Sequence, residues 1–224
     1  MSRLLAHIRQ VLYGPGADSD IRRPWSGIGV RIGLTLVCGA LYGAVMGSFG
    51  WTSGDRPGQV LVSAVKVPML LLVTFAISLP SFFVLNTLVG VRSDFPAAVR
   101  ALAGGQAGLT IVLAALAPYT LLWYTSFSNY GWALTFNGLM FIASTLAGQG
   151  VLRRWYRPLI ARDPRHRWLL RAWLVLYAFV GVQMAWVLRP FVGAPGMPVQ
   201  FFRQESWGNA YVIFSRMIWN GLTR

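Results

Sequence analysis

Five side-chain amides interrupt apolar stretches of this chain and are its first candidates for chemistry. They are Asn86, Gln106, Asn137, Gln149 and Gln183. An amide both donates and accepts hydrogen bonds, and it is costly to leave unpaired in apolar surroundings. We therefore expect these side chains to face a polar partner or line a cavity. No aspartate or glutamate lies in the same stretches, which disfavours a proton relay.

Charged residues beside these stretches form a second candidate group. Glu205 is the single glutamate of the chain, and Lys66 and Arg189 are expected on its side of the molecule. Both cations have long side chains that can extend outward from an apolar segment. A charge-assisted bond from Glu205 to Arg189 or Lys66 would fasten the C-terminal segment to the rest of the chain. This pattern predicts a structural role instead of catalysis.

Signatures of the common enzyme classes are absent from the sequence. It contains no HExxH, CxxC or GxSxG motif and no glycine-rich phosphate loop. His7 and His166 lie far apart in basic sequence, which is not the spacing of a haem or metal pair. The single Cys38 excludes a disulfide within the chain. We therefore expect no enzymatic activity, no cofactor and no metal.

The elements that must position these residues are five apolar stretches, approximately 27–49, 65–90, 101–124, 131–152 and 168–188. Each reaches the roughly 20 residues that a helix needs to cross the hydrocarbon core of a bilayer. Lipid tolerates only structures that satisfy their own backbone hydrogen bonds, so each stretch is predicted to be a helix. The composition agrees, with 55% hydrophobic and 12% charged residues. The sequence predicts an all-α membrane bundle of five transmembrane helices, 27–188, within a single domain, 1–224.

Positive charge lies mainly on one side of the predicted spans. With the N-terminus in the cytoplasm, fourteen of the 20 lysines and arginines fall in cytoplasmic segments. The positive-inside rule therefore predicts a cytoplasmic N-terminus and an external C-terminus in a bacterial inner membrane. This placement explains the net charge of +14, so nucleic acid is not expected as a partner. Five arginines near the cytoplasmic face are expected to contact anionic lipids: Arg153, Arg154, Arg157, Arg165 and Arg167.

Segments outside the spans include two amphipathic helices. In 1–16, five apolar side chains share one helical face: Leu4, Leu5, Ile8, Val11 and Leu12. Such a helix lies in the membrane interface or, alternatively, docks on a partner subunit. The external part, 189–224, combines a loop rich in glycine and proline with a second helical face near the C-terminus. The basic segment 153–171 is expected to be a loop, with a turn at Asp163-Pro164.

Small residues at a spacing of four indicate close helix packing. They are Gly39, Gly43 and Gly47 in the first span and Gly104 and Gly108 in the third. Packing within the chain is the favoured use, and a seam between copies is the alternative.

Three prolines lie within the second and third predicted spans. Pro68, Pro80 and Pro118 are expected to kink or locally open their helices. An opening at Pro80 would expose backbone groups to a solute, as in transporters.

Two runs of sequence resemble a known group of proteins. One is Leu-Pro-Ser-Phe-Phe-Val-Leu-Asn at 79–86. The other is Tyr-Ala-Phe-Val-Gly-Val-Gln-Met-Ala-Trp-Val-Leu-Arg-Pro-Phe-Val-Gly at 177–193, followed by Phe-Phe-Arg-Gln-Glu-Ser at 201–206. Together they resemble a family of uncharacterised bacterial integral membrane proteins, and the five-span layout is similar to that of the Yip-domain family. The resemblance implies the fold but no activity, and it directs attention to one group of residues: Asn86, Gln183, Arg189 and Glu205.

The sequence favours a non-enzymatic membrane subunit or scaffold that packs against other membrane proteins or against itself. The reasons are the small-residue ridges, the amphipathic helices at both ends and the lack of a catalytic set. The alternative is a channel or small-solute transporter whose pathway is lined by the five intramembrane amides.

Overall fold

The computed structural model describes residues 2–13, 27–50, 57–193, 199–202, 211–212 and 219. Six α-helices account for most of them: α1 (Ser2–Tyr13), α2 (Ile28–Gly47), α3 (Pro57–Leu88), α4 (Phe95–Ser126), α5 (Tyr130–Arg162) and α6 (Arg165–Leu188). A short 3₁₀ helix, η2 (Arg92–Asp94), precedes α4. The described part of the chain contains no strand, so the all-α prediction is confirmed for these residues.

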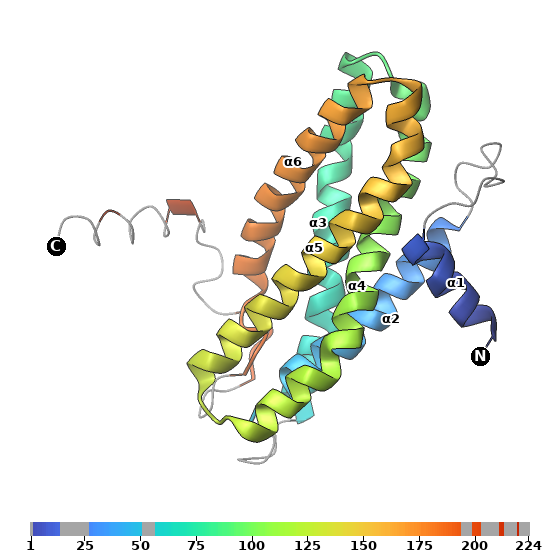
Figure 1. The fold of residues 1–224 in the computed structure, drawn as a ribbon. Coiled ribbons are helices and arrows are strands. Elements are labelled where there is room, and N and C mark those ends of the chain that lie inside the picture. The colour runs from blue at the N-terminus through green and yellow to red at the C-terminus, as the bar shows by residue number, and fades with distance from the viewer. Residues whose placement is uncertain are drawn as a thin grey trace.

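Helices α2 to α6 form one bundle in which successive helices run in opposite directions (Figure 1). The main contacts join α4 to α5, α2 to α3, α2 to α4 and α3 to α6. By contrast, α5 and α6 make few contacts, although they are consecutive. Helix α2 therefore lies between α3 and α4, with α6 packed on α3 and α5 packed on α4.

Four of the described helical segments are long and apolar enough to cross a membrane by length and composition. They are α2, α3, the segment Arg92–Ser126 that contains α4, and α6. The fourth predicted span, 131–152, lies within α5, which is not among these four. Asn137, Gln149 and several glycines lower the hydropathy of α5.

The basic segment 153–171 is helical almost throughout, so its prediction as a loop was wrong. Helix α5 continues to Arg162 and α6 begins at Arg165, which leaves Asp163 and Pro164 between them. Hydropathy reports only the apolar part of a helix. Arginine is a good helix former, so α5 can continue past the end of its apolar part. The predicted turn at Asp163-Pro164 is confirmed.

The prolines do not interrupt their helices. Pro68 and Pro80 lie inside α3, and Pro118 lies inside α4. Helix α3 remains helical from Pro57 to Leu88, so the expected opening at Pro80 does not occur. Phe75 and Phe82 both contact the Trp173 ring, so α6 packs on α3 before and after this residue.

Glycines allow α2 to approach α3 closely. A Cβ atom at Gly47 would lie 2.7 Å from the carbonyl oxygen of Gln59, and one at Gly43 would overlap the carbonyl of Ser63. Gly39 faces α3 on the same side. The ridge on α2 therefore packs within the chain.

The glycines of α4 face α5 in the same way. A Cβ atom at Gly104 would lie 3.2 Å from the Trp155 ring, and one at Gly108 would lie 2.9 Å from Val151. Both predicted ridges thus serve contacts between neighbouring helices of one chain.

Helix α1 lies beside the bundle near the start of α2 (Figure 1). Its Val11 is buried and packs with Leu34 of α2 and Ala107 of α4. The Trp155 indole nitrogen donates to the Val11 carbonyl at 2.8 Å, and Arg154 donates to the Leu12 carbonyl at 3.0 Å. Part of the apolar face of α1 is therefore covered by its own chain.

Besides the small cluster around Val11, two larger apolar clusters form the core. One surrounds Trp155, Tyr156 and Trp173 near the α5–α6 turn. The other surrounds Tyr42 and Leu113 toward the α4–α5 turn. The space between these two clusters contains the candidate site.

Candidate functional site

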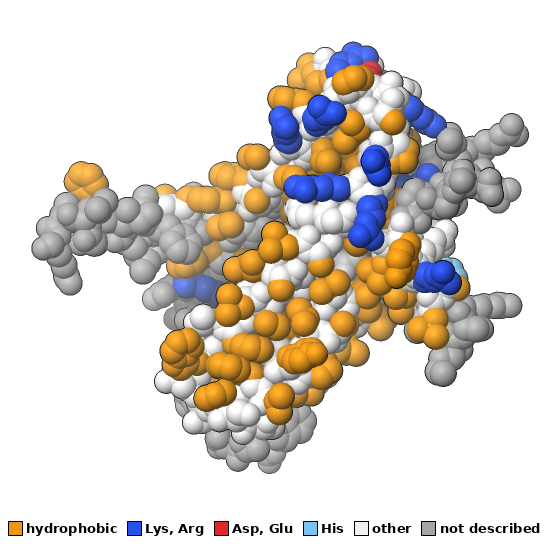
Figure 2. Space-filling view, viewed as in Figure 1, with side chains coloured by type: hydrophobic (Ala, Val, Ile, Leu, Met, Phe, Trp, Pro, Cys, Tyr) orange, Lys and Arg blue, Asp and Glu red, His pale blue; other side chains and the backbone are white. Residues whose placement is uncertain are grey.

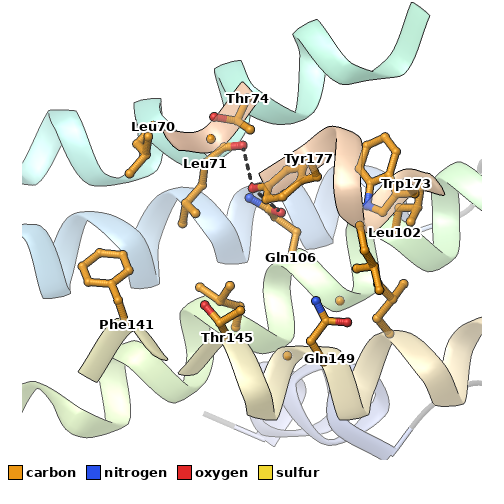
Figure 3. Close-up of a pocket in the computed structure, with 16 residues that line it drawn as sticks. Leu70, Leu71, Thr74, Leu102, Gln106, Phe141, Thr145, Gln149, Trp173 and Tyr177 are labelled. Carbon is orange, nitrogen blue, oxygen red and sulfur yellow. Dashed lines mark hydrogen bonds between the residues drawn. The ribbon is translucent and has the colours of Figure 1, made fainter. Parts of the chain in front are cut away.

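A cavity of about 160 Å³ lies between helices α3, α4, α5 and α6 (Figure 3). We refer to it as the four-helix groove. Its walls are formed within residues 70–74 of α3, 102–109 of α4, 141–152 of α5 and 173–181 of α6. Thr145 of α5 lines the groove and is exposed, so the groove opens beside α5. None of the lining side chains is charged.

The groove results from tight packing on either side of it. Helices α4 and α5 are in contact at Gly105 and Gly148, where added Cβ atoms would lie 2.8 Å from side chains of the other helix. Helices α3 and α6 are held by an edge-to-face contact of Phe75 with Trp173, whose ring centroids are 5.5 Å apart. Because α5 and α6 touch little, the space between the two pairs is not filled.

Gln106 and Tyr177 form the main polar contact of the groove. The Tyr177 hydroxyl donates to Gln106 Oε1 at 3.0 Å and also lies 3.4 Å from the Leu71 carbonyl oxygen (Figure 3). Because this bond occupies the amide oxygen, it orients Gln106 with Nε2 as its remaining donor. Tyr177 therefore positions Gln106.

Three buried polar atoms of the groove have no hydrogen-bond partner among the described residues. They are Gln106 Nε2, Thr74 Oγ1 and Gln149 Oε1. Thr74 is 1% exposed and Gln106 is 8% exposed, so water covers neither side chain. Buried polar groups in folded proteins are normally hydrogen-bonded, and these three provide a donor, a hydroxyl and an acceptor for a bound group.

Asn137 belongs to a separate buried cluster near the α4–α5 turn. Its Oδ1 accepts from the Tyr42 hydroxyl at 3.0 Å, and its Nδ2 donates to the Tyr124 hydroxyl at 2.6 Å and the Ala133 carbonyl at 2.8 Å. Thr120 donates to the Tyr42 hydroxyl at 3.4 Å. The cluster links α2, α4 and α5. Both polar atoms of the Asn137 side chain have hydrogen-bond partners.

Asn86 and Gln183 lie outside the groove, and the structure does not bring them together. Asn86 is buried near the end of α3 and donates to the Phe82 carbonyl at 2.8 Å. Helices α3 and α6 are antiparallel, so Asn86 lies near the start of α6, whereas Gln183 and Arg189 lie near its end. Glu205 falls outside the described residues, and its pairing with Arg189 stays a prediction.

Lys66 is fully buried, so the expectation that it extends outward was wrong. Its Nζ donates to the carbonyl oxygens of Pro190 at 2.9 Å and Gln200 at 3.2 Å, and it faces the Phe201 ring at 5.2 Å. The segment that follows α6 folds over α3 and covers the ammonium. The carbonyls supply hydrogen bonds that Lys66 would otherwise make with water.

The arginines at the ends of α5 and α6 gather at one end of the molecule (Figure 2). Arg165 forms an exposed ion pair with Asp163 at 2.6 Å, and its hydrogen bonds hold the pKa of that carboxyl below its ordinary value. Arg154 is engaged by α1 through the bond to Leu12. The other three arginines expected to contact lipid are exposed: Arg153, Arg157 and Arg167.

A buried histidine joins the two turns at this end. His166 Nε2 lies 3.1 Å from Asp94 Oδ2, and its ring contacts the edge of Tyr156 at 5.9 Å. Asp94 belongs to η2, so the contact ties the α3–α4 connection to the start of α6. The described residues contain no group of three or more histidine, cysteine, aspartate or glutamate side chains that could hold a metal.

Sequence reasoning missed the three groove residues that carry a hydroxyl group, Thr74, Thr145 and Tyr177. Tyr177 had a usable signal, because tyrosines of membrane helices concentrate at the interfaces and this one lies near the middle of α6. The threonines had none, since a threonine in an apolar helix commonly bonds to its own backbone. Comparisons with protein families, curated proteins and solved structures found no match to this chain.

Proposed function

We propose that this chain is an integral membrane protein with five transmembrane helices, α2 to α6. The four apolar helical segments support membrane insertion. Chain connectivity supports the fifth span: α4 ends at one end of the bundle, and α6 begins at the other (Figure 1). If α4 and α6 cross a bilayer, α5 must cross it as well.

The proposed orientation has the N-terminus in the cytoplasm of a bacterial inner membrane and the C-terminus outside. It is supported by the arginines around the α5–α6 turn, which gather at one end of the molecule (Figure 2). Arg92 lies at the same end, because Arg165 donates to the Val89 carbonyl in the α3–α4 connection. Cysteines at positions 18 and 224, introduced singly into Cys38→Ser protein, test it by labelling in intact cells. We expect external labelling at 224 but not at 18. Labelling of position 18 from outside would overturn the orientation.

The function we propose is that of a non-enzymatic subunit that packs against another membrane protein through α6. One observation carries this proposal. Only 11% of the apolar window of α6 is buried in the chain, compared with 33% for each of the other three candidate spans. Val175, Phe179 and Val182 are exposed at helical spacing on this helix. Tyr211 of the C-terminal segment stacks on Phe179 at 4.7 Å, so this part of the face already has a contact within the chain, and Val175 and Val182 mark the part proposed for the partner.

Crosslinking tests whether protein or lipid covers this face. A photoreactive amino acid replaces Val175 in α6 or, as the matched control, the exposed Val37 in α2. We expect a discrete adduct of increased protein mass from position 175 and none from position 37. Lipid adducts alone at both positions would contradict the proposal.

A transport function is tested with the same purified protein. A pathway lined by all five amides has little support, because only Gln106 and Gln149 share the groove. Selective solute or ion flux into liposomes that contain this protein alone would replace the subunit proposal.

A further inference from the structure

The four-helix groove has the size of a small ligand site. Its volume of about 160 Å³ is similar to that of an engineered protein cavity, roughly 150 Å³, that binds benzene. The groove lies near the middle of all four helices, as shown by Thr74 in α3, Gln149 in α5 and Tyr177 in α6. It can therefore hold one ring-sized group or a comparable part of a lipid.

We propose that the groove binds an uncharged, lipid-soluble molecule through a carbonyl or hydroxyl oxygen. Gln106 Nε2 is the donor to that oxygen, and Thr74 Oγ1 is a second hydrogen-bonding group. Gln149 Oε1 accepts a hydrogen bond where the ligand carries a hydroxyl. The apolar part of the ligand packs against Phe141 and Trp173.

The uncharged character of the ligand follows from the lining. No charged side chain lines the groove, so a phosphate or carboxylate would be buried without a counter-ion, which is strongly unfavourable. A pure hydrocarbon would fill the space but leave Gln106 Nε2 and Thr74 Oγ1 unpaired. A neutral molecule with one or two oxygen atoms satisfies both requirements.

The amide of Gln106 is held in place by a neighbouring side chain. Gln106 is 8% exposed, and its amide oxygen is occupied by Tyr177 at 3.0 Å. The Tyr177 bond therefore fixes which end of the amide donates, and Nε2 has no partner among the described residues before any ligand binds. Pre-orientation of this kind lowers the entropic cost of binding.

Native mass spectrometry of delipidated full-length protein tests the proposal with three probes. A short-chain benzoquinone and a diacylglycerol carry the predicted oxygen chemistry from two different sources, and phosphatidylglycerol is the charged comparison. We expect one of the two neutral probes to form a 1:1 complex that raises the thermal unfolding temperature. The probe that binds shows whether the carbonyl group of the ligand belongs to a quinone or to a diacylglycerol.

Three variants test whether the neutral probe binds in the groove. Gln106→Leu should weaken the neutral probe about fivefold, the effect of losing one neutral hydrogen bond. Thr145→Trp should block the exposed opening beside α5 without changing the buried walls. The matched control is Gln183→Leu, which removes an amide from α6 outside the groove and should leave the affinity unchanged.

Several outcomes would overturn the site. They are the absence of a 1:1 complex with both neutral probes, equal affinity of wild-type and Thr145→Trp protein, or the same loss of affinity in Gln183→Leu as in Gln106→Leu. If Gln106→Leu does not fold, the Thr145→Trp comparison still decides. The experiment uses purified protein alone, so its failure is distinguishable from failure of the proposed α6 contact.

Discussion

At the scale of single residues, the buried amides act as hydrogen-bonding links between helices. Asn137 connects two tyrosines that lie on α2 and α4, and Gln106 is connected to α6 through Tyr177. Asn86 instead bonds to the carbonyl of Phe82 in its own helix. An uncharged amide can provide such links in apolar surroundings at a lower cost than a charged side chain.

The Asn137 cluster leads to a stability prediction. Asn137→Leu removes the partner of the Tyr42 and Tyr124 hydroxyls, and it should lower the free energy of unfolding by about 1–2 kcal/mol. Thermal unfolding in mild detergent measures this change. Thr135→Val, on an exposed part of α5, is the control and should have little effect.

The coupling within the cluster is tested by a second substitution. Tyr42→Phe removes the hydroxyl that donates to Asn137. The double variant should therefore lose clearly less stability than the sum of the single variants. Strict additivity would show that the two side chains do not act together.

At the scale of the helices, close packing is set by where glycine occurs. On α2, Gly43 and Gly47 allow the backbone of α3 to come near, whereas Gly33 has open space around it. The same residue type thus has different roles within one helix. Its role depends on which side of the helix faces a neighbour.

This contrast gives a matched pair of substitutions. Gly43→Ala places a methyl group against the Ser63 carbonyl and should reduce the folded fraction and the unfolding temperature. Gly33→Ala adds the same methyl group without a contact and should be neutral or stabilise the helix by about 0.5–1 kcal/mol. Fluorescence-detected size exclusion after heating measures both variants. Equal behaviour would show that α2 and α3 are not closely packed at Gly43.

At the scale of the whole molecule, the charge distribution defines two unlike ends. Seven of the 20 lysines and arginines lie between Arg153 and Arg171, around the α5–α6 turn, and blue side chains gather at this end (Figure 2). Lys66 lies toward the opposite end, where the chain itself covers it. A bilayer with an anionic cytoplasmic surface would favour the first end on that side. The asymmetry is the basis of the proposed orientation and of the proposed contact with lipid headgroups.

The exposed arginines should prefer anionic lipid. Arg153→Gln, Arg157→Gln and Arg167→Gln should each weaken binding of phosphatidylglycerol relative to phosphatidylcholine, by about 1 kcal/mol near the membrane surface. Lipid titration followed by native mass spectrometry measures the preference at low and high salt. Arg224→Gln carries the same charge change at the C-terminus and is the control. An equal effect of all four substitutions would show that only the net charge matters.

Much of the architecture could be predicted because helical character and apolar length are local properties. The predicted span 168–188 and helix α6 (Arg165–Leu188) end at the same residue. The predicted loop at 153–171 failed because hydropathy does not report a helix that continues into polar surroundings. The burial of Lys66 could not be predicted, since it depends on a segment more than a hundred residues later that folds over α3.

The sequence by itself determined the helical class, the concentration of arginine in 153–171 and the identity of the amides that an apolar environment would constrain. Only the tertiary structure decided which of these amides meet. Gln106 and Gln149 share a groove with Thr74 and Tyr177, whereas Asn86, Asn137 and Gln183 do not. The physical reason is that the groove depends on distances between helices. These distances are set jointly by glycines on α4 and α5 and by aromatic packing between α3 and α6.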